Sequence, residues 1–292
     1  MRSKVLARAV VIVALAAPGW AQTNIGAAPV EAGQLVQRVV EHELADARSK
    51  QAHLMFTAVK QTPNGVTTHR YVQTKDAMAG MVIAYNGIPL TAEQRQAEDA
   101  RIRRFIGNPD ELAKKQSKER ENAHRIQAIT KAMPAAFLYE YDGKAVGTHG
   151  VGKEGAELIR LKFRPNPKYE PPGRVEQMLT GMAGTVLIDA QHERMVQVEG
   201  TLMQDVGFGW GILGRLDKGG HFLLQQGMVA GDKWAPTRTD LDMTGTLLWF
   251  KKLKAKFSEV YSDHQVVASD LTYEQGVDLL EKQAPVPREQ GP

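Results

Sequence analysis

Hydrophobic residues recur first at helical spacing and then at strand spacing along this chain. Between Glu31 and Arg48 they fall three or four positions apart, as on one face of an amphipathic helix. From residue 52 the period changes, and two runs that favour strands, 52–62 and 66–74, flank Asn64-Gly65, a dipeptide that strongly predicts a tight hairpin. We therefore expect a helix followed by a β-hairpin.

A helical insertion is predicted within residues 91–133. Thr91 with Gln94 has the sequence of a capping box, and Asn108-Pro109 supplies an N-cap and a proline at the first helical position of a second helix. Almost nothing is apolar from 113 to 125, so this stretch is expected to project into water or to meet a polar partner. The two helices are interpreted either as a solvated pair on the surface or as a mobile lid over a cavity.

Strand patterns dominate the rest of the chain. Ile159, Leu161 and Phe163 alternate with charged residues, as in a strand with one buried face. Most connections are short, which permits antiparallel neighbours but not helical crossovers. The expected strands are Ala79–Tyr85, Phe137–Tyr141, Leu158–Arg164, Thr185–Ala190, Met195–Leu202, His221–Val229, Trp234–Met243, Thr246–Leu253 and Lys256–Val267. With a terminal helix expected at Thr272–Lys282, the pattern predicts about ten strands and four helices in one α+β domain over residues 31–283, and Gly173–Leu179 is a candidate for an additional short helix.

The N-terminal segment 1–21 has the pattern of an export signal. Three basic residues precede the apolar run Ala9–Ala17, and small residues at Gly19 and Ala21 suit cleavage after Ala21. A membrane anchor is the alternative, but a span requires about 20 apolar residues. We expect a periplasmic protein that is not transmembrane after cleavage, with a flexible lead-in at 22–30 and a disordered tail at 284–292.

The formal net charge is smaller once residues 1–21 are set aside. The chain has 37 basic and 33 acidic residues, a formal net charge of +4, and residues 1–21 hold three of the basic ones and none of the acidic ones. The remaining chain is therefore close to neutral. Nucleic-acid binding requires a basic face with a reading motif, so no nucleic-acid partner is expected.

No group of residues indicates a chemical reaction. The absence of cysteine excludes disulfides, thiolate metal sites and thiol nucleophiles. The eight histidines are scattered without metal-ligand spacing, so neither a metal nor a cofactor is expected. Gly209–Gly214 spells a dinucleotide fingerprint, but no helix pattern follows it, and we interpret it as a glycine-rich bend. A periplasmic hydrolase would need Asp240 and Asp242 to share a cleft with a histidine.

Large apolar side chains remain, spread over the expected strands. They are interpreted either as ordinary core or as the wall of an unfilled apolar groove that holds an acyl chain or hydrophobic peptide. The candidate groove residues are Phe56, Tyr139, Tyr141, Phe163, Phe208, Trp210, Phe222, Trp234 and Trp249. The basic run Lys251, Lys252, Lys254 and Lys256 either faces anionic headgroups or forms a solvated strand face.

Three segments resemble exported proteins of the outer-membrane lipoprotein carrier superfamily, which includes LolA, LolB and RseB. They are Asn86–Gln94, Gly184–Asp189, and Lys233–Pro236 with the following Gly245–Phe250. The resemblance implies a highly curved antiparallel sheet, an incomplete barrel, covered by inserted helices over an apolar cavity. No binding residue of the family matches a numbered position. Without cysteine, the chain cannot be an anchored lipoprotein of the LolB type.

These observations predict an exported, non-enzymatic binding protein that carries or senses an acyl chain or lipidated polypeptide in an apolar groove. The alternative is an envelope interaction or structural module with a filled core, docking an envelope protein through the helix expected at 109–132.

Overall fold

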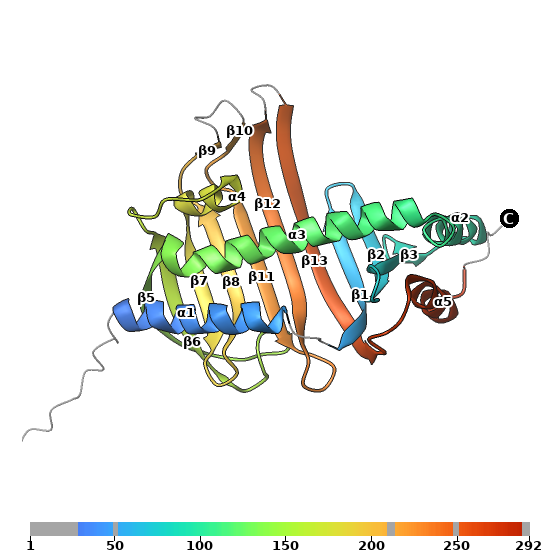
Figure 1. Cartoon of the computed structure of the whole chain (residues 1–292), viewed down its shortest axis with the longest axis horizontal. Coiled ribbons are helices and arrows are strands. Elements are labelled where there is room, and N and C mark those ends of the chain that lie inside the picture. Colours follow the sequence, from blue (N-terminus) through green and yellow to red (C-terminus); the bar gives the residue numbers. More distant parts are fainter. Residues whose placement is uncertain (1–28, 49–51, 209–213, 248–250, 288–292) are drawn as a thin grey trace, which may run out of the picture.

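A single large antiparallel sheet organises the computed structural model, which describes residues 29–48, 52–208, 214–247 and 251–287. Its strand order is β4-β3-β2-β1-β13-β12-β11-β8-β7-β6-β5; off this path, the short β10 pairs with β12 and β9 pairs with β10 (Figure 1). The strands are β1 (His53–Thr62), β2 (Gly65–Val72), β3 (Ala79–Tyr85), β4 (Ile88–Pro89), β5 (Phe137–Val146), β6 (Glu157–Pro165), β7 (Met182–Asp189), β8 (Arg194–Leu202), β9 (Val206–Phe208), β10 (Gly214–Leu216), β11 (His221–Met228), β12 (Trp234–Leu247) and β13 (Lys251–Val267). The helices are α1 (Pro29–Asp46), α2 (Ala92–Arg103), α3 (Pro109–Ala136), α4 (Arg174–Gln177) with the 3-10 turn Met178–Gly181, and α5 (Tyr273–Gln283).

One half of the sheet is covered by α1 and the C-terminal part of α3, which runs across the strands (Figure 1). Val36 and Val39 on the apolar face of α1 are fully buried against this half. They pack with Phe137 and Leu161 from β5 and β6, and with Met133 near the end of α3. The helical spacing read from the sequence therefore produces the principal hydrophobic core.

A second core lies at the other end of the sheet. Met55, Val72 and Met81 project from one face of β1, β2 and β3 and are buried against Ile102 of α2 and Val277 of α5. Because side chains alternate between the two faces of a strand, the residues between them face the opposite side. That opposite side lies under the N-terminal half of α3 and contains the cavity described below.

The predicted helix starts are confirmed. The Thr91 hydroxyl accepts a bond from Gln94 N, and the Gln94 side chain accepts one from Thr91 N, at 3.2 and 3.0 Å. The Asn108 side chain likewise accepts from Glu111 N at 3.2 Å. Such caps satisfy backbone N–H groups that have no partner within the helix.

The predicted end of the insertion at residue 133 is wrong, because α3 continues through Pro134 to Ala136. Proline removes one backbone donor from a helix. The carbonyls of this last turn have partners outside the helix: the Tyr139 hydroxyl donates to the Met133 oxygen at 3.0 Å, and Asn166 Nδ2 donates to the Ala135 oxygen at 2.9 Å. Tertiary contacts thus support a helical turn that the local sequence disfavours.

The sequence predicts three strands between Trp234 and Val267, but the structure has two long strands there, β12 and β13. The expected break near Gly245 is absent because β12 continues through it to pair with β10. A Cβ at Gly245 would clash with the backbone oxygen of Arg215, so this glycine permits close approach of two strands rather than a turn. The short strands β4, β9 and β10 were not expected, since two or three residues show no readable period.

The α+β class is confirmed: within the described residues, thirteen antiparallel strands form a sheet that is not closed. The Asn64-Gly65 hairpin and the helices at 173–179 and 272–282 are also confirmed, as β1–β2, α4 and α5. α1 begins at Pro29, within the expected lead-in. The export signal, most of the lead-in and residues 288–292 lie outside the described residues, and the single-domain assignment stays a prediction.

Candidate functional site

A cavity of about 700 Å³ lies between the sheet and the N-terminal half of α3. Strands β1, β2, β3, β12 and β13 supply its walls, and residues from α2, α3 and α5 line the rest of it, leaving the cavity partly open to solvent. Its lining comprises Leu54, Phe56, His69, Tyr71, Gln73, Met78, Gly80, Val82, Arg101, Phe105, Lys115, Glu119, Ala235, Pro236, Glu259, Tyr261, His264 and Tyr273.

Aromatic rings gather around Phe56 on one wall of this cavity. The Phe56 ring centroid lies 5.5 Å from that of Tyr71, 5.9 Å from that of Tyr261 and 5.7 Å from that of His264. His69 stacks on Tyr71 with centroids 5.5 Å apart. These distances are typical of favourable aromatic contacts, so the wall is a continuous aromatic surface drawn from three adjacent strands.

Strand register explains this gathering. Phe56 is directly opposite Tyr71, and Ala58 on the same face of β1 is opposite Tyr261. The β1–β13 register shifts between Met55 and Thr57, a bulge that brings His264 beside Phe56. On the next strand Gly80 faces Tyr71, where a Cβ would lie 2.5 Å from the ring, so the glycine leaves room for the tyrosine.

Burial shifts the pKa values of the titratable rings of this wall in the direction that favours their neutral forms. It is the largest cause that raises the pKa of Tyr71 to about 12, with Glu259 adding to the effect, and it also raises the pKa of Tyr261. Burial lowers the pKa of His69 and of His264 below the usual value of 6.5. Since desolvation disfavours the charged form in each case, the wall presents uncharged rings at neutral pH.

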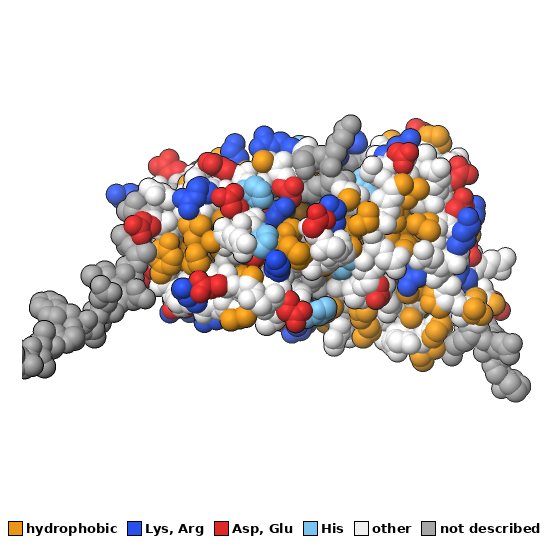
Figure 2. Space-filling view, turned by 90° about the horizontal axis from the view of Figure 1, so that it is seen from below, with side chains coloured by type: hydrophobic (Ala, Val, Ile, Leu, Met, Phe, Trp, Pro, Cys, Tyr) orange, Lys and Arg blue, Asp and Glu red, His pale blue; other side chains and the backbone are white. Residues whose placement is uncertain are grey.

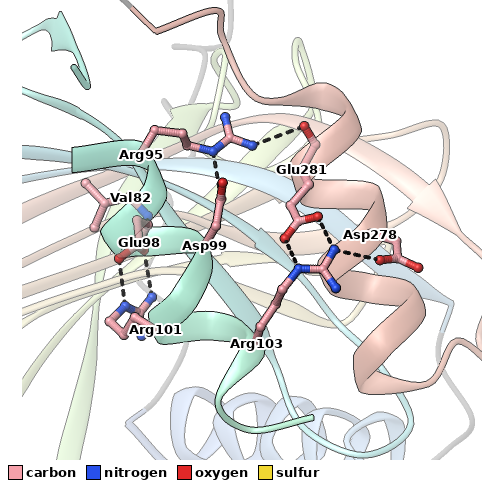
Figure 3. A network of polar contacts seen from close by, with 8 residues as sticks. All are labelled: Val82, Arg95, Glu98, Asp99, Arg101, Arg103, Asp278 and Glu281. Carbon is pink, nitrogen blue, oxygen red and sulfur yellow. Dashed lines mark hydrogen bonds and ion pairs between the residues drawn. The ribbon is translucent and has the colours of Figure 1, made fainter. Parts of the chain in front are cut away.

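Arg101, the guanidinium that lines the cavity, is neutralised by Glu98. The two side chains form hydrogen bonds of 2.7 Å from Arg101 Nε and Nη2 (Figure 3). The Val82 N–H donates to the same carboxylate at 2.6 Å, and Arg101 donates to the Gly80 oxygen at 2.8 Å. The hydrogen bonds with Glu98 raise the pKa of Arg101. This pair fixes α2 against the edge of β3 and leaves little spare charge for a ligand.

The other charged lining residues also have partners. Lys115 Nζ lies 2.6 Å from Glu119 Oε1, and Glu119 Oε2 accepts a bond of 3.1 Å from Met78 N. Glu259 Oε2 lies 3.5 Å from Lys60 Nζ. The Glu119 contact ties α3 to the chain entering β3. The cavity is therefore compensated in charge, and basic and acidic side chains are likewise interspersed over the surface in Figure 2.

A further set of ion pairs joins α2 to α5 beside this site (Figure 3). Arg103 bonds to the Glu281 carboxylate and lies 3.4 Å from Asp278. Arg95 bonds to Asp99 at 2.7 Å and to the Glu281 backbone oxygen at 3.2 Å. Exposed ion pairs of this kind each contribute little to folding stability, about 0–1 kcal/mol. Together these contacts connect α2 to α5 at several points.

The structure brings one of the predicted groove residues, Phe56, into this cavity. Tyr139 and Phe163 are buried in the principal core, and Tyr141, Phe208 and Phe222 pack against that core. Trp234 lies elsewhere, with its ring 5.8 Å from the Arg194 guanidinium and 5.6 Å from the His192 ring. Trp210 and Trp249 lie outside the described residues.

Sequence reasoning missed the lining residues Tyr71, Tyr261, His69, His264 and Tyr273. Period-two alternation places Tyr71 on the same face of β2 as His69, and this signal could have been read. The pairing of β1 with β13 could not, because these strands are separated by most of the chain.

Asp240 and Asp242, the two carboxylates considered for a hydrolase site, form polar contacts with nearby side chains. Asp240 accepts from Arg238 and Ser258 at 2.9 and 2.6 Å, and Asp242 accepts from Lys256 at 2.5 Å. In the part of the chain that the structure describes, no three or more His, Asp or Glu residues are placed to hold a metal ion, and no helix is long and apolar enough to cross a membrane.

Comparison with models of known protein families found no match, and comparisons with curated proteins and with solved structures found none either. The resemblance to the lipoprotein carriers therefore stays a prediction. The geometry of the cavity carries the functional argument.

Proposed function

We propose that this protein binds an acyl chain, free or attached to a polypeptide, without covalent chemistry in the cavity under α3. The observation that carries the proposal is a space of about 700 Å³ whose aromatic rings are held neutral and whose charged groups are paired. Pockets for small ligands usually have volumes of roughly 300–1,000 Å³ and mainly apolar linings. A cavity of this kind favours a neutral, apolar ligand over a polar or ionic one.

The energetics favour a chain of several methylenes. Each buried CH₂ contributes about 0.8 kcal/mol, so ten contribute about 8 kcal/mol before the cost of association, which is at least about 4 kcal/mol. Affinity in this range needs no catalytic or ionic group, and the compensated charges at Arg101 and Lys115 are consistent with that requirement.

The arrangement proposed here is an incomplete barrel with α3 as a cover, in an exported periplasmic protein. It accords with the predicted export signal and with the resemblance to lipoprotein carriers. The contact of Glu119 with Met78 N, which fastens the cover to β3, lies at the margin of the cavity.

Displacement of a fluorescent fatty acid tests the proposal. The full mature chain is expected to bind the probe and to release it to unlabelled palmitate. Met78→Trp introduces a large ring at the lining and should weaken binding at least tenfold, whereas Tyr141→Ala, which removes a ring packed against the principal core, should leave it unchanged. Absence of probe binding by the folded wild-type chain would contradict the proposal, as would equal binding by the Met78 variant.

A second candidate function is docking of an envelope protein on α3. It is favoured by the middle of this helix, where residues 121–126 are all exposed and Ile126 has 64% of its surface accessible. A photo-crosslinker at Ala123 should then link one defined partner in the cell envelope, and one at Glu154, which is also exposed, should not. Equal labelling from both positions would contradict this function.

A further inference from the structure

Part of β13 has a strand partner on one side only. β12 pairs with β13 as far as Lys251, opposite Leu247. On the other side, the pairing with β1 ends where Gln61 meets Ser258. Among the described residues, Lys251–Phe257 therefore has no strand on that edge, and Figure 1 shows β12 and β13 extending beyond the β1–β2 hairpin.

Lysines follow this open edge. Lys252, Lys254 and Lys256 project from one face at intervals of roughly 6.6 Å, twice the rise per residue of a strand. Lys256 is paired with Asp242, while Lys251, Lys252 and Lys254 are exposed and make no ion pair within the described part of the chain. Lysine commonly protects an edge strand against aggregation, so charge alone does not make this a binding site.

A hollow of about 470 Å³ beside the edge adds a second observation. The β1–β2 turn, Thr62–Asn64, lines one side, and Lys254–Phe257 line the other. Side chains from both faces of β13 take part, as expected for a space next to the strand's edge. Lys60 Nζ lies 4.3 Å from the centre of the Phe257 ring, so the hollow combines an aromatic surface with a basic rim.

We propose that an extended acidic peptide segment of a partner protein binds here as an additional strand beside Lys251–Phe257. Strand addition uses backbone hydrogen bonds for affinity and side-chain sites for specificity. Acidic side chains of the peptide would meet Lys252 and Lys254, and an apolar side chain would enter the hollow beside Phe257. An anionic membrane would use the lysines but neither the open backbone edge nor the hollow, so the peptide accounts for more of the observations. This site is separate from the proposed acyl-binding cavity.

Fluorescence polarisation with a labelled eight-residue peptide tests the proposal. The probe alternates glutamate with valine or threonine, and its control carries N-methyl groups at alternate residues, which remove backbone donors. We expect saturable binding of the first by the wild-type chain and at least tenfold weaker binding of the second. The double variant Lys252→Glu, Lys254→Glu should also lose at least tenfold, while Lys153→Glu, Lys168→Glu, a matched charge change at exposed sites elsewhere, should bind as wild type.

Three results would overturn the proposal. Equal binding of the N-methylated peptide would exclude strand addition, and this comparison uses only the wild-type chain, so it does not depend on folding of a variant. Absence of peptide binding would mean that the lysines only protect the edge. Binding to phosphatidylglycerol vesicles without binding to the peptide would identify a membrane surface. If the lysine variant still binds the fatty acid, its loss of peptide binding is not caused by a change in the proposed acyl-binding cavity.

Discussion

Truncation of Phe56 separates the role of the cavity wall from the role of the principal core. Phe56 is half-buried at the centre of the aromatic wall, with its ring within 5.9 Å of three others. A fully buried Phe→Ala change costs about 3–5 kcal/mol, so this half-buried ring should cost about 2 kcal/mol of unfolding free energy. If an acyl chain covers about 60 Å² of the ring, its loss removes about 1.5 kcal/mol of binding free energy, roughly a tenfold increase in Kd.

Phe163→Ala is the matched control. Phe163 is 3% exposed, and its ring lies 4.6 Å from that of Phe137 in the principal core. Its truncation should cost about 3–5 kcal/mol of stability yet leave the Kd for a fluorescent fatty acid unchanged. The assay is therefore a probe titration at a temperature where circular dichroism shows both variants folded, combined with urea unfolding of each.

The opposite pattern would refute the reasoning. If Phe163→Ala weakened binding and Phe56→Ala did not, the ligand would lie in the principal core or elsewhere. If Phe56→Ala did not fold, Phe56→Leu would provide the same comparison with a smaller expected change, since it retains an apolar side chain at the wall.

Three further predictions concern stability. Because burial lowers the pKa of His69 and His264, the unfolded chain binds more protons than the folded chain below about pH 7, and the free energy of unfolding should fall as pH drops through 6.5. Urea unfolding at pH 7.5 and 5.5 should show a smaller fall in the variant with both histidines replaced by Phe than in the wild-type chain. An equal fall in the two chains would contradict this prediction. Asn108→Ala should cost about 1 kcal/mol, since it removes the cap on Glu111 N, and an unchanged urea midpoint would count against the cap. Gly245→Val should destabilise the chain far more than Gly107→Val, because a Cβ at 245 clashes with the Arg215 backbone whereas a Cβ at 107 meets nothing within 4 Å. Equal thermal midpoints of the two variants would show that β10 does not approach β12 so closely.

Local signals in the sequence were reliable predictors of local structure. The Thr91–Gln94 box, the Asn108 cap and the Asn64-Gly65 hairpin each depend on residues within a few positions of one another, and each lies where it was predicted. Pro134 and Gly245 were misread for one common reason. Their usual effects are overridden by contacts outside the local element. For Pro134 these contacts come from Tyr139 in the strand that follows and from Asn166, 31 residues from its partner Ala135; for Gly245 they come from β10.

The candidate site was only partly predictable. The sequence identified an apolar ring at Phe56 but gave no means to choose it over Tyr139 or Phe163, which have similar strand contexts. What distinguishes Phe56 is its position under α3 and beside β13. That position depends on the pairing of His53 with Val267 across most of the chain, and on a bulge of one residue. Neither feature has a local signature.

Native mass spectrometry of the full chain purified from the cells that naturally produce it tests the central claim most directly. The account predicts a bound species with the mass of a lipid or acylated molecule, released on denaturation and absent from the Met78→Trp variant. A spectrum of the folded wild-type chain that shows only the bare polypeptide mass, before and after incubation with fatty acids, would contradict it.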